Sequence, residues 1–132
     1  MKSIAQVLGS RIGNIVSIAP DETVKAALKL MAAHEVGALL VMEKGKLVGL
    51  VSERDYARKV ALEGKAAETT RVDEIMAKKL ISTTLAMGSK EAMALMAKNN
   101  IRHLPVLDEK KTCLGIVSIR DFVHDLEGED ED

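Results

Sequence analysis

The sequence contains no tryptophan, one tyrosine and one phenylalanine among its 132 residues. Proteins that hold single-stranded nucleic acid usually stack bases on aromatic rings, so this shortage disfavours a nucleic-acid partner. The single cysteine, Cys113, excludes an internal disulfide and fits a reducing compartment. No apolar run reaches the roughly 18 residues of a transmembrane helix, and the first residues lack the apolar core of a signal peptide. We therefore expect a cytoplasmic protein with no membrane partner.

Catalytic and metal-binding patterns are missing as well. The three histidines (His34, His103 and His124) and Cys113 do not have metal-ligand spacing. Neither a P-loop nor a Gly-x-Ser-x-Gly elbow occurs. We predict a protein that is not an enzyme and holds no metal. A nucleotide hydrolase stays a minor alternative, because the chain offers no positioned base.

Charge is nearly balanced, with 19 basic and 20 acidic residues and a formal net charge of −1. Five of the acidic residues lie at 127–132, which we expect to be a disordered tail. The rest of the chain has 19 basic against 15 acidic residues. This mild excess of positive charge suits a small anionic ligand better than it suits DNA.

What the sequence does contain is an internal repeat. Residues 16–56 align with residues 81–122 at an offset of 65, which becomes 66 after one inserted residue. The clearest match pairs Gly-Leu-Val-Ser-Glu-Arg-Asp-Tyr at 49–56 with Gly-Ile-Val-Ser-Ile-Arg-Asp-Phe at 115–122. Chance is a poor explanation for that agreement, so we infer a duplicated structural unit.

Each copy is predicted to form a strand, an amphipathic helix, a two-stranded hairpin and a second helix, in the order βαββα. Asp21 or Thr23 can cap the first helix, and Gly64 can end the last helix of the first copy. The expected helices and hairpin strands are 24–32, 38–42, 47–51 and 52–63 in the first copy, and 89–98, 103–108, 113–117 and 118 onwards in the second.

Short capped helices at 3–8 and 70–76 precede the two copies. We therefore divide the chain into repeat 1 with its lead-in helix (1–65), repeat 2 with linker and lead-in helix (66–126), and the tail. A unit with one short hairpin cannot bury both faces of its sheet alone. We expect an α+β fold in which the two repeats pack together with pseudo-two-fold symmetry.

Tandem βαββα units with Gly-h-h-Ser-x-x-Asp opening the last helix resemble a pair of cystathionine-β-synthase-type (CBS) domains, or Bateman module, of the stand-alone prokaryotic type. The resemblance covers about residues 3–126 and is carried further by 36–41, 52–60 and 101–106. It implies adenosyl ligands (AMP, ADP, ATP, NAD or S-adenosylmethionine) in clefts between the repeats. It also implies a disc-shaped homodimer of CBS pairs.

The repeated Ser-x-x-Asp corner is the main candidate site, formed by Ser52 and Asp55 in one repeat and by Ser118 and Asp121 in the other. Unpaired backbone N–H groups at a helix start favour anions. An aspartate there could accept hydrogen bonds from two ribose hydroxyls. The same pattern is also a capping box that only satisfies a helix end.

Two glycines precede the corners, and the two repeats differ in sequence at one neighbouring edge. Gly49 and Gly115 would let a ligand or another backbone segment come close. Arg102 and His103 stand where the first repeat has Gly37-Ala38, and the resemblance implies that this edge contacts phosphate or base. We therefore expect the corner with Asp121 to be the better anion site.

Further cations and apolar residues complete the candidate set. The cations could meet a phosphate, with a solvated helix face as the alternative, and they are Arg54, Arg58, Lys59, Arg120 and, as a further candidate, Arg11. The apolar positions would form a slot for the base by resemblance, or else are plain core, and they are Val16, Val36 and Gly37 for one cleft and Ile81 and Ile101 for the other.

The sequence thus predicts a regulatory sensor of adenosyl ligands. The nucleotide would be a regulatory ligand rather than a required cofactor, and would act through a conformational or dimer change on an unknown effector protein. The alternative is a ligand-independent dimerisation or adaptor scaffold whose clefts are vestigial.

Overall fold

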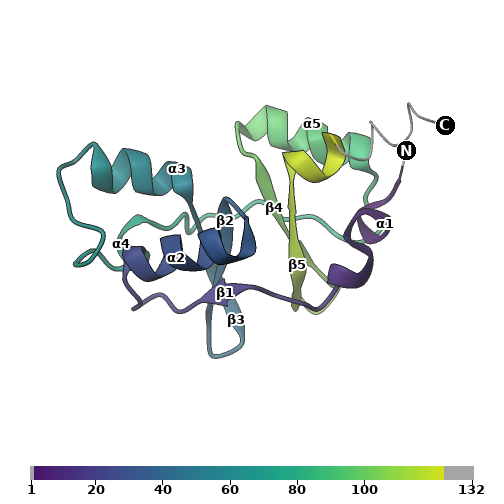
Figure 1. Ribbon diagram of the computed structural model, residues 1–132. Coiled ribbons are helices and arrows are strands. Elements are labelled where there is room, and N and C mark those ends of the chain that lie inside the picture. The colour runs from purple at the N-terminus through teal and green to yellow at the C-terminus, as the bar shows by residue number, and fades with distance from the viewer. Residues whose placement is uncertain (1, 124–132) are drawn as a thin grey trace. The chain divides into compact units, whose positions relative to one another are not determined.

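The computed structural model describes residues 2–123, and the chain divides into two compact units. The repeat-1 unit comprises residues 16–80, and the repeat-2 unit comprises residues 2–15 and 81–123. Each unit has a two-stranded hairpin with helices packed against it (Figure 1). The predicted α+β class with two repeats of strands and helices is confirmed. The expectations for His124 and for the tail lie outside the described residues.

In the repeat-1 unit, a three-stranded sheet has the order β1-β2-β3, with β1 parallel to β2 and β2 antiparallel to β3. The Thr23 hydroxyl caps the first long helix by accepting a hydrogen bond from the Ala26 amide at 3.1 Å. The elements are β1 (Ser17–Ile18), α2 (Val24–His34), β2 (Ala38–Glu43), β3 (Lys46–Ser52), α3 (Glu53–Tyr56), the π-helical η2 (Ala57–Ala61) and α4 (Val72–Ile75).

The repeat-2 unit has the same order with a weaker first strand. The strand expected near residue 81 is reduced to a parallel bridge between Thr83 and Val106. Residues 119–123 are helical after the hairpin, as the repeat predicts. The elements are α1 (Ile4–Leu8), the 3-10 turn η1 (Gly9–Arg11), α5 (Ser89–Asn99), β4 (His103–Leu107) and β5 (Cys113–Ser118).

The last helix of repeat 1 differs from the single α-helix expected at 52–63. Only Glu53–Tyr56 is α-helical, and Ala57–Ala61 continues as a π-helix, in which the Leu62 amide bonds the Ala57 carbonyl five residues back. Val60 in this segment is fully buried in the unit's core. Single π turns inside helices are frequent at functional sites.

The lead-in helices are grouped differently from the division at residue 65. Helix α1 packs in the repeat-2 unit, where the Ile4 amide bonds the Met87 carbonyl at 2.8 Å and the side chains of Ile4 and Leu8 are buried. Helix α4 lies in the repeat-1 unit, and Ala77 after it exchanges two backbone hydrogen bonds with Leu50. Each lead-in segment thereby covers the hairpin of the repeat that it does not precede.

The two hairpin glycines face the lead-in segments, and the approach at Gly49 is too close for any side chain. A Cβ built on Gly49 would lie 2.5 Å from the Met76 sulfur, and one built on Gly115 would lie 3.5 Å from a Leu8 methyl carbon. The sequence left open whether a ligand or a backbone segment lies next to these glycines. In both units the neighbour is the chain's own lead-in segment.

Candidate ligand-binding corners

The first corner lies where β3 ends and α3 begins. The Ser52 amide and hydroxyl donate to Asp55 Oδ2 at 2.9 and 3.0 Å, and the Asp55 amide donates back to Ser52 Oγ at 3.2 Å. This is a complete capping box, so the capping reading of the Ser-x-x-Asp motif is correct for this repeat. The box leaves Asp55 Oδ1 outside the cap.

The second corner, after β5, shares the serine-to-aspartate bonds of this arrangement. The Ser118 amide and hydroxyl donate to Asp121 Oδ2 at 2.8 and 3.4 Å. The motif therefore fixes the rotamer of each aspartate, with one oxygen on the helix start and the other available to a partner.

Backbone amides at these corners are already bonded, contrary to expectation. The Glu53 amide donates to the Gly37 carbonyl at 3.0 Å, and the Ile119 amide donates to the Arg102 carbonyl at 2.9 Å. Because the serine amides are also taken, the predicted anion site of unpaired N–H groups is wrong for these donors. These four amides are therefore not free donors for an anion.

Each aspartate also pairs with one cation through its second oxygen. Arg11 Nη2 lies 3.1 Å from Asp121 Oδ1, and Lys59 Nζ lies 3.1 Å from Asp55 Oδ1. The aspartate side chains are 21% and 18% exposed, and the two cations are about half exposed. The ion pairs are therefore reachable from solvent.

His103 lies beside the second corner, because its backbone pairs with Ser118 across the β4–β5 ladder. Burial lowers the pKa of His103 below its ordinary value. The Asp121 carboxylate opposes that shift, and the Arg102 guanidinium adds to it. At neutral pH the imidazole is therefore uncharged, and a second negative group nearby would favour its protonation.

The structure places the remaining candidates in two groups. The other predicted cations are all exposed, and they are Arg54, Arg58, Arg102 and Arg120. Of the apolar positions, Val16 packs partly buried on the repeat-1 core, and Ile81 and Ile101 on the repeat-2 core. Val36 is 38% exposed, beside the half-buried Gly37.

Sequence reasoning missed two groups at the first corner. Glu53 Oε1 lies 3.0 Å from the position of a Cβ on Gly37, so its carboxylate covers that glycine. The Ile75 carbonyl accepts a hydrogen bond from Lys59 Nζ at 2.8 Å. The Asp55–Lys59 spacing of four residues in a predicted helix was a signal for the ion pair, but no local pattern pointed to Ile75.

The surface also carries an open groove of about 490 Å³ along β1 and α2, lined among others by Ile18, Ala26, Leu30 and Ala33. No corner residue lines it. Among residues 2–123, no group of three or more His, Cys, Asp or Glu side chains could hold a metal ion. No helix in that range is long and apolar enough to cross a membrane.

Comparison with known proteins finds similar proteins for both repeats and for nearly the full length of the chain. The CBS domain profile matches residues 8–62 and 72–128. A putative signal-transduction protein with CBS domains from Burkholderia ambifaria superposes with a TM-score of 0.90 and 39% identity, over 95% of this chain and 93% of that one. The CBS domain pair of MJ0100, solved in complex with 5′-methylthioadenosine and S-adenosylmethionine, has a TM-score of 0.78 and 25% identity, over 87% of this chain and 90% of that one.

A longer relative is the mitochondrial CBS domain-containing protein CBSX3 of Arabidopsis thaliana, which is 44% identical over 108 residues. The match takes in 78% of this chain but only about half (52%) of that protein. Two profile matches, one on each repeat, and a structural match over nearly the full length confirm the resemblance first seen in the sequence. The chain therefore belongs to the CBS domain family, as a tandem pair of CBS domains.

Proposed function

We propose that this chain is a regulatory binding module for an adenosyl ligand, and that the ligand docks at the second corner. The observation that carries the proposal is the cluster of side chains around Asp121: a partly exposed carboxylate paired with Arg11, next to His103 and Arg102. A carboxylate flanked by cations matches the two polar parts of a nucleotide, the ribose diol and the phosphate.

The carboxylate of Asp121 has the capacity for a ribose. Each ionised carboxylate oxygen accepts about two hydrogen bonds. Oδ2 serves the Ser118 amide and hydroxyl, whereas Oδ1 has the single ion pair with Arg11. The cap thus orients the group without using it up, and hydroxyl donors can approach the second oxygen.

The phosphate would find its partners among the nearby cations. Arg11, Arg102 and Arg120 are exposed guanidinium groups, each with five N–H donors in a planar fork that suits phosphate oxygens. The lowered pKa of His103 keeps it neutral at pH 7, and it gains a proton more readily beside an anion. This set is the basis for expecting an anionic adenosyl ligand such as AMP, ATP or NAD.

The ligand class also has support from a relative, since the MJ0100 pair was solved with two adenosyl compounds. On this proposal the nucleotide is a regulatory ligand, and its binding biases the conformation or the dimer of CBS pairs that an effector protein reads. We keep the cytoplasm as the expected compartment, on the basis of the single cysteine.

The test is a thermal-shift screen followed by calorimetry on the full chain. AMP, ADP, ATP, NAD and S-adenosylmethionine are each added, and the binding ligand should stabilise by about 2.7 kcal/mol at a hundredfold excess over its Kd. Asp121→Ala should reduce the shift to about half or less, whereas Glu109→Ala, which removes an exposed acid of the same unit, should preserve it. Absence of any shift in the wild type, or full binding by Asp121→Ala, would contradict the proposal.

A second candidate function is a dimerisation or adaptor scaffold that needs no ligand. The two capping aspartates favour it, because each carboxylate already has partners in its own helix start and one cation. This candidate predicts a homodimer whose mass in light scattering and melting temperature do not respond to nucleotides. A ligand-dependent melting temperature would exclude it.

A further inference from the structure

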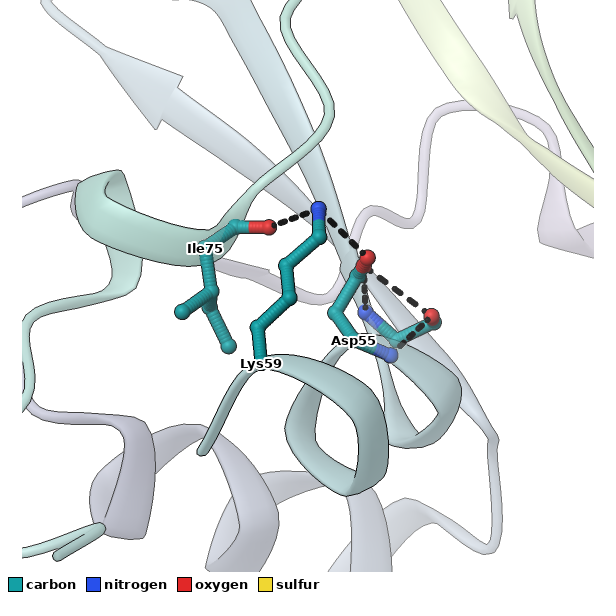
Figure 2. Close-up of polar contacts among 4 residues, drawn as sticks. Asp55, Lys59 and Ile75 are labelled. Carbon is teal, nitrogen blue, oxygen red and sulfur yellow. Dashed lines mark hydrogen bonds and ion pairs between the residues drawn. The ribbon is translucent and has the colours of Figure 1, made fainter. Parts of the chain in front are cut away.

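The first corner contains a cation that the chain supplies to itself. Lys59 Nζ bridges Asp55 Oδ1 at 3.1 Å and the Ile75 carbonyl at 2.8 Å, as Figure 2 shows. An ammonium has three N–H donors, so these two contacts use most of its capacity. Asp55 Oδ2 is held by the Ser52 amide and hydroxyl, so both carboxylate oxygens have partners within the repeat-1 unit.

Local structure holds Lys59 in this position. It lies four residues after Asp55, and the π-helical segment Ala57–Ala61 contains it. The Ile75 carbonyl belongs to the last residue of α4, where carbonyl groups have no partner inside the helix. The lysine therefore satisfies a helix end and a carboxylate at once, across 16 residues of sequence.

The sequence has no lysine at the equivalent position of the second repeat, which lies outside the described residues. At the repeat offset of 66, the position of Lys59 is taken by Asp125. The cation beside Asp121 is instead Arg11, from the turn after α1, and its guanidinium has five donors. Arg11 can thus keep the carboxylate as a partner and still donate to a phosphate, which Lys59 can do only by leaving a contact.

The surrounding charges strengthen the contrast. Glu53 covers Gly37 at the first corner, whereas Ile119 stands at its position in the second repeat. The Arg102-His103 pair of the second repeat is replaced by Gly37-Ala38. The first corner therefore has a second carboxylate and lacks the Arg102-His103 pair, and the cation on its aspartate is already engaged, although Arg54 matches Arg120. This is a poorer environment for a phosphate than the second corner.

We infer that Lys59 acts as an internal ligand that occupies the first corner, so that the chain binds one nucleotide, at Asp121. Its ammonium lies on the carboxylate oxygen that a ribose hydroxyl would approach, and its second bond to the Ile75 carbonyl leaves it one donor for a phosphate. The inference rests on the proposed function, and it adds the stoichiometry and the residue that determines it. It also reverses the expectation that Lys59 meets a phosphate.

Calorimetric titration of the full chain with AMP tests the stoichiometry. We expect one AMP per chain for the wild type and for Asp55→Ala, with similar Kd values. Asp121→Ala should weaken binding by about 10- to 100-fold, the loss of one or two hydrogen bonds to a charged group. Asp55→Ala and Asp121→Ala each remove the helix cap of their own corner. Circular dichroism checks that both variants fold, and Asp55→Asn and Asp121→Asn replace them if either does not.

The outcomes separate the two proposals. Two AMP molecules per wild-type chain, or a clear loss of affinity in Asp55→Ala, would overturn the inference that Lys59 occupies the first corner. Either result would leave the proposed function intact. Absence of binding by the wild type, for AMP and for the other adenosyl compounds in the screen, would overturn both.

Lys59→Met tests the residue itself, with adenosine as the probe because the corner becomes more acidic without the lysine. We expect a second adenosine to bind Lys59→Met, and one to bind the wild type and Lys65→Met, a charge-matched control at an exposed position of the same unit. A single adenosine on Lys59→Met would refute the role of the lysine. Weaker AMP binding at the remaining site would also refute it, since it would mean that Lys59 contacts the phosphate.

Discussion

Gly49 and Gly115 occupy the same position in the two repeats, yet the structure predicts opposite effects of adding one methyl group. A Cβ on Gly49 would lie 2.5 and 2.9 Å from the Met76 Sδ and Cγ atoms and 3.1 Å from the Ala77 carbonyl oxygen. A Cβ on Gly115 would meet its nearest atom, a Leu8 methyl carbon, at 3.5 Å, which is ordinary van der Waals contact.

The magnitudes follow from these contacts. Overpacking a well-packed site costs about 1–3 kcal/mol, and Met76 can move only in part because Ala77 is held by two backbone bonds to Leu50. Gly→Ala at a compatible backbone position stabilises by about 0.4–1 kcal/mol through the unfolded state. Gly49→Ala should therefore lose about 0–2.6 kcal/mol of stability, and Gly115→Ala should gain about 0.4–1 kcal/mol.

Urea unfolding of both variants beside the wild type measures the two free energies. Each variant is the control for the other, because the sequence change and the strand environment are the same. If Gly49→Ala were as stable as Gly115→Ala, the close approach of α4 to the first hairpin would be refuted. The assignment of that lead-in segment to the repeat-1 unit would be refuted as well.

Three further outcomes are expected. Thr23→Ala removes the cap of α2 and should lower the free energy of unfolding by about 1 kcal/mol, whereas Thr23→Ser should preserve most of it; equal losses would refute the cap. Because burial lowers the pKa of His103, the unfolded state binds the proton first, so melting temperature should fall as pH drops through about 6.5. His103→Gln should reduce that dependence, and an unchanged profile would contradict it. Burial raises the pKa of Cys113, so Ellman's reagent should label it slowly at pH 8 until urea is added; rapid labelling of the folded chain would count against a buried thiol.

The repeated elements could be predicted from sequence because their signals are local. Helical periodicity predicted α2 and α5 to within a few residues, and the strand–turn–strand pattern predicted both hairpins. The Thr23 cap was one of two candidates, and the structure selects it. The Ser-x-x-Asp boxes were recognisable as possible caps, since capping depends only on residues three apart.

The anion site of free amides was the least successful prediction. It treated each helix start as an isolated end, whereas the Gly37 and Arg102 carbonyls of the neighbouring strands bond the first amide of the following helix. Whether such an amide is free depends on the strand that lies beside it. No spacing within the motif contains that information.

The sequence alone determined the duplication, the order of the elements, the family and the residue types at both corners, because periodicity, capping and turn chemistry act over a few neighbouring residues. Tertiary structure decided which lead-in helix covers which hairpin and which cation meets which aspartate. Arg11 reaches Asp121 from the opposite end of the described chain, and Lys59 reaches Ile75 across 16 residues. Such pairings depend on the packing of distant segments around a shared core, which no local pattern specifies.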